Sequence, residues 1–246
     1  CFQYDQTVTK ISLPSSIKSI GNYAFYECKL LTQISIPLSV NSIGIFSFAF
    51  CSSLTQVFIP SSVTSIGENA FNGCKSLTKV SFVFPSSVIS IEEKSFCNCK
   101  SLKEITIPSS VTSIENNAFC ECSSLSCVSF EIPSLINYIG EYAFQNCKSL
   151  CNVYLPNISF LSEIKKYAFN CCSSLSQISI PQSVTKIDEM AFVGCESLIL
   201  ISFADPSSLV EIGINAFYSC SSLSKISIPS SVTKIGENAF LGCESL

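Results

Sequence analysis

The sequence repeats itself with a period of 23 or 25 residues along its whole length. Residues 54–76 read LTQVFIPSSVTSIGENAFNGCKS, and residues 223–245 read LSKISIPSSVTKIGENAFLGCES. The first positions of the ten repeats are Val8, Leu31, Leu54, Leu77, Leu102, Leu125, Leu150, Leu175, Leu198 and Leu223. This period leaves few possible folds, because a unit so short cannot bury a core alone and must stack on its own copies.

The shared pattern of the repeats is L-x-x-I-x-I-P-x-S-V-x-x-I-G-x-x-A-F-x-x-C-x-S. Its L-x-x-I-x-I part alternates apolar and polar residues, which predicts a short strand with one buried face. The proline that follows has no N–H and ends the strand. S-V-x-x-I predicts a second extended segment, with Val63 and Ile66 pointing inward in the third repeat. The A-F-x-x-C spacing predicts one short helical turn.

Stacked repeats of this kind form an α/β solenoid, a ribbon of about ten repeats with parallel strands and short helical turns. We expect one repeat domain over residues 1–246. The sequence begins at Cys1 and stops within a repeat at Leu246, so we expect it to be a fragment of a longer array. Its last repeat matches the shared pattern, and we therefore expect an exposed apolar end face that further repeats or self-association would cover.

The motif IPxSVxxIGxxAFxxC resembles the BspA-like, treponemal-type branch of the leucine-rich repeat family. Ten near-copies make the resemblance specific, and it covers essentially the whole chain. It implies a horseshoe-like solenoid on the surface of mucosa-dwelling bacteria and protists. It also implies binding to host extracellular-matrix proteins or to other cells, without catalytic residues and without fixed ligand contacts.

Two side chains recur once in every repeat. The phenylalanine of the A-F pair predicts a core spine of stacked rings. It occupies Phe25, Phe48, Phe71, Phe96, Phe119, Phe144, Phe169, Phe192, Phe217 and Phe240. The cysteine three residues later occupies Cys28, Cys51, Cys74, Cys99, Cys122, Cys147, Cys172, Cys195, Cys220 and Cys243. Because these thiols all point the same way, free buried thiols are favoured over disulfides between repeats.

Composition narrows the function classes. The chain has 14 lysines, no arginine and a net charge of −4, which argues against nucleic-acid binding and against a polybasic membrane surface. No apolar run is long enough to span a bilayer, so we expect no membrane insertion. The absence of histidine excludes a serine triad and disfavours zinc. We therefore expect no enzyme activity and no cofactor.

Departures from the shared pattern are the places where binding could be encoded. Four repeats are two residues longer, and the extra residues lie beside the proline. They are Val83 and Phe84, Glu131 and Ile132, Ala204 and Asp205, and a stretch from Asn157 to Phe160 that follows Pro156. Insertions at one position fall on one edge of a solenoid, so we expect these loops to lie together where the first strand ends. Tolerated loop growth, which costs little free energy, is the favoured explanation, and a contribution to binding is the alternative.

The outward positions of the first strands form the broadest surface. The fifth position is serine or threonine in eight repeats, and the two exceptions are Phe58 and Tyr154. The third position is mostly polar, with Leu200 as an exception. Phe58, Tyr154, Leu200, Val83, Phe84, Ile132 and Asp205 are therefore the candidate contacts for a protein or glycan partner of modest charge. Single exposed apolar residues are also common without any function.

Two functions remain open. One is a binding or adhesion module at the cell surface or outside the cell, with a protein or glycan partner that could be extracellular matrix. The other is an intracellular scaffold for protein–protein interaction, which free cysteines would suit.

Cys97 and Cys120 both directly follow the repeated phenylalanine, in adjacent repeats. Equivalent atoms of stacked repeats lie about 5 Å apart, within the Cα range of a disulfide. Other repeats hold chemically mixed residues at this position, which indicates an exposed site. The hypothesis is a disulfide between repeats on the outer side of the solenoid, and its alternative is a pair of unrelated surface thiols.

Overall fold

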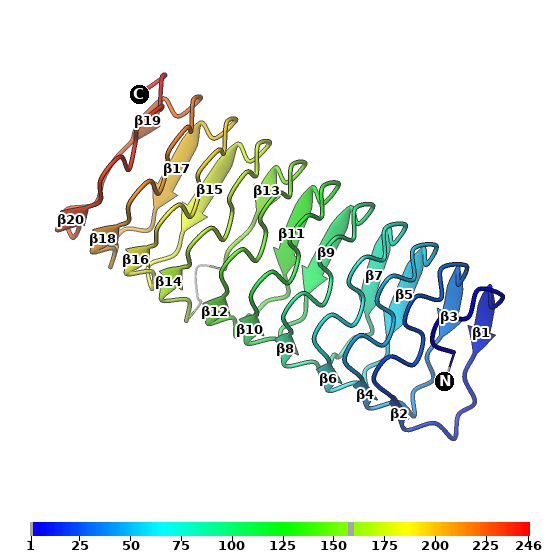
Figure 1. The fold of residues 1–246 in the computed structure, drawn as a ribbon. Helices are drawn as coiled ribbons and strands as arrows, with labels where there is room; N and C mark the ends of the chain where they lie inside the picture. Colours follow the sequence, from blue (N-terminus) through cyan, green and yellow to red (C-terminus); the bar gives the residue numbers. More distant parts are fainter. Residues whose placement is uncertain (1, 157–159) are drawn as a thin grey trace.

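The computed structural model describes residues 2–156 and 160–246 as one elongated, twisted stack of turns (Figure 1). Each repeat supplies one strand to each of two columns. The first column holds β1 (Lys10–Ser12), β3 (Gln33–Ser35), β5 (Gln56–Ile59), β7 (Lys79–Phe82), β9 (Glu104–Ile107), β11 (Cys127–Phe130), β13 (Asn152–Val153), β15 (Gln177–Ile180), β17 (Leu200–Phe203) and β19 (Lys225–Ile226).

The second column consists of two-residue strands. They are β2 (Ser19–Ile20), β4 (Ser42–Ile43), β6 (Ser65–Ile66), β8 (Ser90–Ile91), β10 (Ser113–Ile114), β12 (Tyr138–Ile139), β14 (Glu163–Ile164), β16 (Lys186–Ile187), β18 (Glu211–Ile212) and β20 (Lys234–Ile235). Every strand pair is parallel and joins neighbouring repeats at equivalent positions, as Gln56 with Lys79. The predicted parallel strands, including the second extended segment, are confirmed.

The prediction of short helical turns is wrong, because the described residues contain no helix. The A-F segment instead forms tight turns whose alternate N–H groups bond to the next repeat. Phe25 N donates to Ser47 O at 2.7 Å, and Glu27 N donates to Ala49 O at 2.8 Å. A helix would direct every N–H along its own axis, leaving none for the neighbouring repeat. The fold is therefore a β-solenoid rather than an α/β solenoid.

Left-handed backbone makes these turns possible. Two residues per repeat have positive φ, one just before the alanine and one just before the cysteine. In the third repeat they are Asn69, with φ 57°, and Gly73, with φ 72°. Asparagine and glycine accept this region most readily, so the N-A-F-x-G-C sequence of the third and tenth repeats favours this turn.

The predicted phenylalanine spine is confirmed. Consecutive rings from Phe25 to Phe240 stack nearly parallel, with centroids between 5.0 Å (Phe25 and Phe48) and 5.6 Å (Phe96 and Phe119). Phe2 extends the spine by one ring, since it stacks on Phe25 at 5.4 Å. Leucine, isoleucine and valine from both strand columns fill the rest of one continuous core.

The last repeat leaves several apolar side chains uncovered. Ile235, Leu241 and Leu246 are each about half exposed.

Candidate binding surface

The outward side chains at the third and fifth positions of the first-column strands form a continuous surface, which we call the strand face. Its third position holds Lys10, Gln33, Gln56, Lys79, Glu104, Cys127, Asn152, Gln177, Leu200 and Lys225. Its fifth position holds Ser12, Ser35, Phe58, Ser81, Thr106, Ser129, Tyr154, Ser179, Ser202 and Ser227. Shallow hollows follow this face along the stack.

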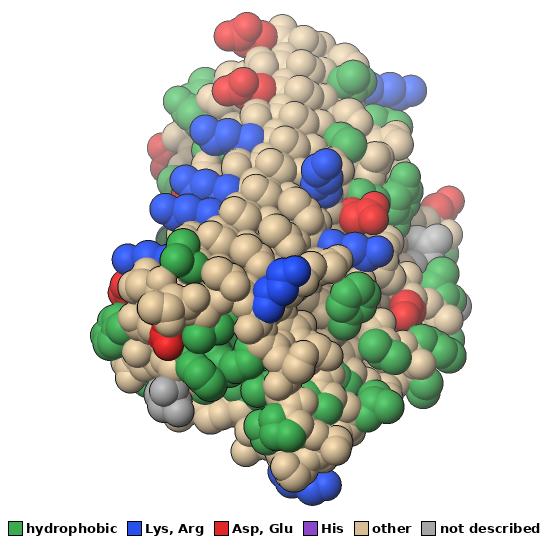
Figure 2. Space-filling model, turned by 90° about the vertical axis from the view of Figure 1, so that its right-hand side faces the viewer, with side chains coloured by type: hydrophobic (Ala, Val, Ile, Leu, Met, Phe, Trp, Pro, Cys, Tyr) green, Lys and Arg blue, Asp and Glu red, His purple; other side chains and the backbone are tan. Residues whose placement is uncertain are grey.

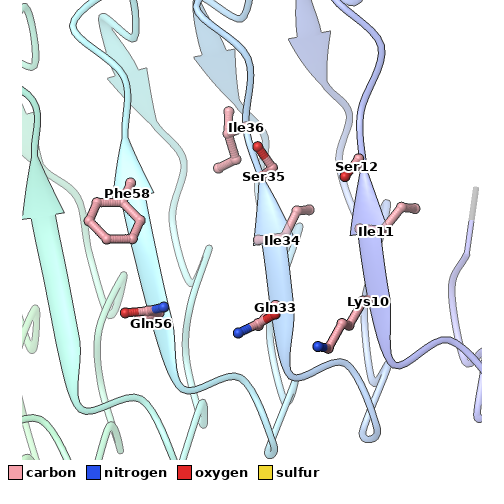
Figure 3. Close-up of a pocket in the computed structure, with 9 residues that line it drawn as sticks. All are labelled: Lys10, Ile11, Ser12, Gln33, Ile34, Ser35, Ile36, Gln56 and Phe58. Carbon is pink, nitrogen blue, oxygen red and sulfur yellow. The ribbon is translucent and has the colours of Figure 1, made fainter.

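Phe58 borders a hollow of about 460 Å³ at the N-terminal end of the strand face. The ring is 50% exposed. Gln56, Gln33 and Lys10 lie in one row across three strands beside it (Figure 3). The structure thus places this predicted residue at the edge of a concave and mostly uncharged site.

Tyr154 borders a second hollow, of about 290 Å³, farther along the same face. The ring is 61% exposed. Asn152, Gln177 and Leu200 also line this hollow, and none of its lining residues is charged. The structure therefore brings two of the predicted residues, Tyr154 and Leu200, into one site.

The inserted residues lie where first-column strands end, as expected. Phe84 and Ile132 are strongly exposed, at 76% and 86%, and Val83 is exposed to a smaller extent. Each of the described insertions ends in a cis peptide bond, before Pro85, Pro133 and Pro206. The fourth insertion is predicted at residues 157–160, of which 157–159 lie outside the described residues.

These loops are spread along the edge rather than gathered into one site, because 23-residue repeats separate most of them. Asp205 shares a hollow with Leu200 and Lys225. Glu131 has a structural role, since its carboxylate accepts a hydrogen bond from Ser109 N at 3.0 Å.

The expectation that Cys97 and Cys120 are exposed is wrong. Each is only 8% exposed, because this position faces the neighbouring repeat rather than solvent. The Cys120 thiol lies 3.6 Å from Gln145 Oε1, and Asn98 Nδ2 lies 3.6 Å from Cys97 Sγ. A hydrogen bond with Cys120 lowers the pKa of the Cys97 thiol, so the two thiols are neighbours. Both are free in the structure.

A cluster of aromatic rings on the turn side of the first repeats went unnoticed in the sequence. Tyr26 makes edge contacts with Tyr4, Tyr23, Phe46 and Phe50, at centroid distances of 5.5 to 6.2 Å. Four of these five residues have positive φ, all except Tyr26. The available signal was aromatic residues at positions where other repeats hold asparagine or glycine.

The second strand column carries alternating charges in its last four repeats. Glu163, Lys186, Glu211 and Lys234 are direct neighbours in the ladder. Lys234 pairs with Glu211 of the neighbouring strand at 2.9 Å, and Lys186 pairs with Asp188 of its own repeat at 3.2 Å. Opposite charges paired across strands stabilise a sheet, so these side chains have a structural role.

Charge and hydrophobic side chains are scattered on the face seen in Figure 2. Hydrophobic side chains appear there in separate patches beside a long band that is neither charged nor hydrophobic.

Among residues 2–156 and 160–246, no three His, Cys, Asp or Glu side chains are placed to hold a metal ion. Within the same ranges, no helix is long and apolar enough to cross a membrane.

A stack of parallel strands, with one leucine-led turn per repeat and a continuous apolar core, defines a leucine-rich repeat solenoid. The sequence profile of the BspA type leucine rich repeat region matches residues 1–126, 80–158 and 123–246. The chain therefore belongs to the BspA-type leucine-rich repeat family.

Solved structures of bacterial proteins share the fold. A leucine-rich repeat protein from Bacteroides ovatus is 29% identical, with a TM-score of 0.65 over 99% of this chain and 79% of its own. A leucine rich cell surface protein from Faecalibacterium prausnitzii is 26% identical, with a TM-score of 0.53 over 97% and 86%. The pneumococcal vaccine antigen PcpA, 24% identical over 93% of this chain and 58% of its own, has a TM-score of 0.60 and shows the fold alone. No curated protein matches the sequence.

Proposed function

We propose that this chain is a non-catalytic adhesion module of a cell-surface protein, and that its strand face binds a protein or glycan partner such as extracellular matrix. The observation that carries the proposal is the pair of exposed aromatic rings, Phe58 and Tyr154, at a strand-face position that is serine or threonine in the eight other repeats. Aromatic side chains with polar surroundings are typical centres of binding energy. The family membership and the surface naming of the Faecalibacterium relative support the location.

Placing arginines on the strand face tests this function. Thr106 and Ser129 lie side by side in its centre, with 3.1 Å between their hydroxyl oxygens. The double variant Thr106→Arg, Ser129→Arg is expected to abolish binding to immobilised matrix proteins and to host cells. Ser19→Arg with Ser65→Arg, both exposed on the second strand column, is the matched control and should bind normally. Equal binding by both variants would contradict the proposal.

The alternative is an intracellular scaffold, and the free thiols favour it. All fifteen cysteines among the described residues are unpaired, which suits a reducing compartment. Antibody labelling of the full-length protein on intact and on permeabilised cells separates the two functions. Labelling of intact cells supports the surface module, and labelling only after permeabilisation supports the scaffold.

A further inference from the structure

The two hollows beside Phe58 and Tyr154 contain the same chemistry in mirror order along the stack. In each hollow, the repeat that holds the aromatic ring also contributes an amide side chain. The adjacent repeat contributes a glutamine and a serine, and the repeat beyond it contributes another serine. From Phe58 these repeats follow toward the N-terminus, and from Tyr154 toward the C-terminus. The sets are Phe58, Gln56, Gln33, Ser35 and Ser12 in one hollow, and Tyr154, Asn152, Gln177, Ser179 and Ser202 in the other. Two copies of one side-chain set on one face indicate one class of ligand.

Each ring is at least half exposed and has short side chains on both sides. Ser81 is the direct neighbour of Phe58 in the ladder, and Ser35 holds the same position on the other side. Tyr154 stands between Ser129 and Ser179 at this position. Serine is too short to cover an aromatic face, so a flat, weakly polar group can stack there.

The polar groups around the rings are almost all neutral. The Tyr154 hollow contains no charge, and the Phe58 hollow contains only Lys10, which lies two repeats from the ring. Each amide offers two donors and one acceptor oxygen, and each serine offers one donor and an acceptor. This set matches a ligand that presents both donors and acceptors without net charge, as the adjacent hydroxyls of a sugar do.

We propose that these hollows bind neutral pyranose units of a glycan, with the sugar's C–H face on the ring and its hydroxyls on the amides and serines. This inference rests on the proposed function, since it names the ligand class of the strand face. An extended peptide fits less well. It would add to a sheet edge with unpaired backbone groups, whereas the strand face presents side chains.

The two sites cooperate if one glycan reaches both. Phe58 and Tyr154 are four repeats apart, which at strand spacing is about 20 Å along the stack. Linked sites raise the overall affinity without any new contact when the ligand spans them. A long glycan is therefore expected to bind more tightly than a single sugar.

The test uses cellohexaose, maltohexaose, mannohexaose and chitohexaose as neutral probes, and hexagalacturonate as a charged one. Saturation-transfer NMR and calorimetry are expected to show binding of at least one neutral probe and none of hexagalacturonate. Phe58→Ser and Tyr154→Ser each introduce the residue that most other repeats hold, so the fold is retained. Each is expected to weaken binding about tenfold, a typical loss for an aromatic contact at the centre of a site. The double variant should bind no probe.

Tyr4→Ser removes a ring of similar exposure, 58%, that lines neither hollow, and is expected to leave probe binding unchanged. Absence of binding to every neutral probe overturns the inference, and so does equal binding by the double serine variant. If the unmodified protein binds matrix proteins through the strand face yet ignores the sugars, the glycan inference fails while the adhesion function stands. The glycan inference also fails, and the adhesion function stands, if enzymatic deglycosylation of the matrix protein leaves its binding to this chain intact.

Discussion

The thiol of Cys74 donates a hydrogen bond to the carbonyl oxygen of Phe48 in the preceding repeat, with 3.2 Å between sulfur and oxygen. Cys51 has the same relation to Phe25, and Cys220 to Phe192. The cysteine column thus ties each phenylalanine backbone to the next repeat. This explains why a polarisable donor recurs here instead of a purely apolar side chain.

Removing one of these thiols should destabilise the solenoid. Cys74→Ala deletes a fully buried group and its hydrogen bond, and is expected to lower the free energy of unfolding by about 1–3 kcal/mol. Urea titration followed by circular dichroism measures the change. Cys127→Ala, on the half-exposed strand face, is the control and should change stability by less than about 0.5 kcal/mol. Equal losses in the two variants would refute the structural role of the column.

Stability should fall in mild alkali. Burial raises the pKa of Cys74 well above its ordinary 9.0, and that of Cys220 to about 12. Below pH 9 both the folded and the unfolded chain keep these protons, so stability stays constant. Above pH 9 only the unfolded chain releases them, and each buried thiol then subtracts about 1.4 kcal/mol per pH unit. Urea midpoints at pH 7, 8, 9 and 10 measure this loss, and equal midpoints at pH 8 and pH 10 would contradict it.

Gly67 lies close to the backbone of the preceding repeat. A Cβ added at Gly67 would lie 2.6 Å from the backbone nitrogen of Ile45, whereas one added at Gly21 would meet nothing within 4 Å. Gly67→Ala is therefore expected to cost about 1–3 kcal/mol, and Gly21→Ala almost nothing. Thermal unfolding of the two variants side by side tests this difference. A loss at Gly21 as large as that at Gly67 would exclude close packing as the cause.

Cys97 and Cys120 are predicted to form a disulfide when the folded protein is treated with diamide. The two adjacent thiols would give two protons and two electrons to the oxidant. Alkylation and peptide mapping without reduction should then show a cross-linked peptide pair. In Cys97→Ser, Cys120 should be alkylated instead. Full alkylation of both residues after oxidation of the unmodified protein would exclude the bond.

Self-association of this chain through the exposed apolar side chains of its last repeat stays a prediction. Leu241 is 54% exposed there. Leu241→Lys should lower the fraction of dimer in sedimentation velocity at high protein concentration. Leu38→Lys changes a leucine that is even more exposed, at 70%, but lies in the second repeat, and should have no effect. A monomer at every concentration would overturn the prediction.

The sequence correctly predicted which of the positions shared by all repeats are buried. It did not predict the backbone conformation where one residue spacing fits two kinds of turn. Phe119 and Cys122 are buried as expected, because their period alone places them in the core. The spacing of alanine, phenylalanine and cysteine also fits a helical turn, and only the positive φ of residues such as Asn117 reveals the true turn. Burial of Cys97 was missed because varied residues at one position suggest exposure, whereas this position faces the same position of the adjacent repeat, here Cys120.

The register between repeats affects how the number of repeats can change during evolution. Because equivalent residues of neighbouring repeats lie directly beside each other, the gain or loss of one whole repeat leaves every other interface intact. The separation of Phe58 and Tyr154 can therefore change only in steps of one repeat, about 4.8 Å each. The distance between the two sites is therefore always a whole number of repeats. Recombination between near-identical repeats could tune it to the length of a ligand without redesigning either site.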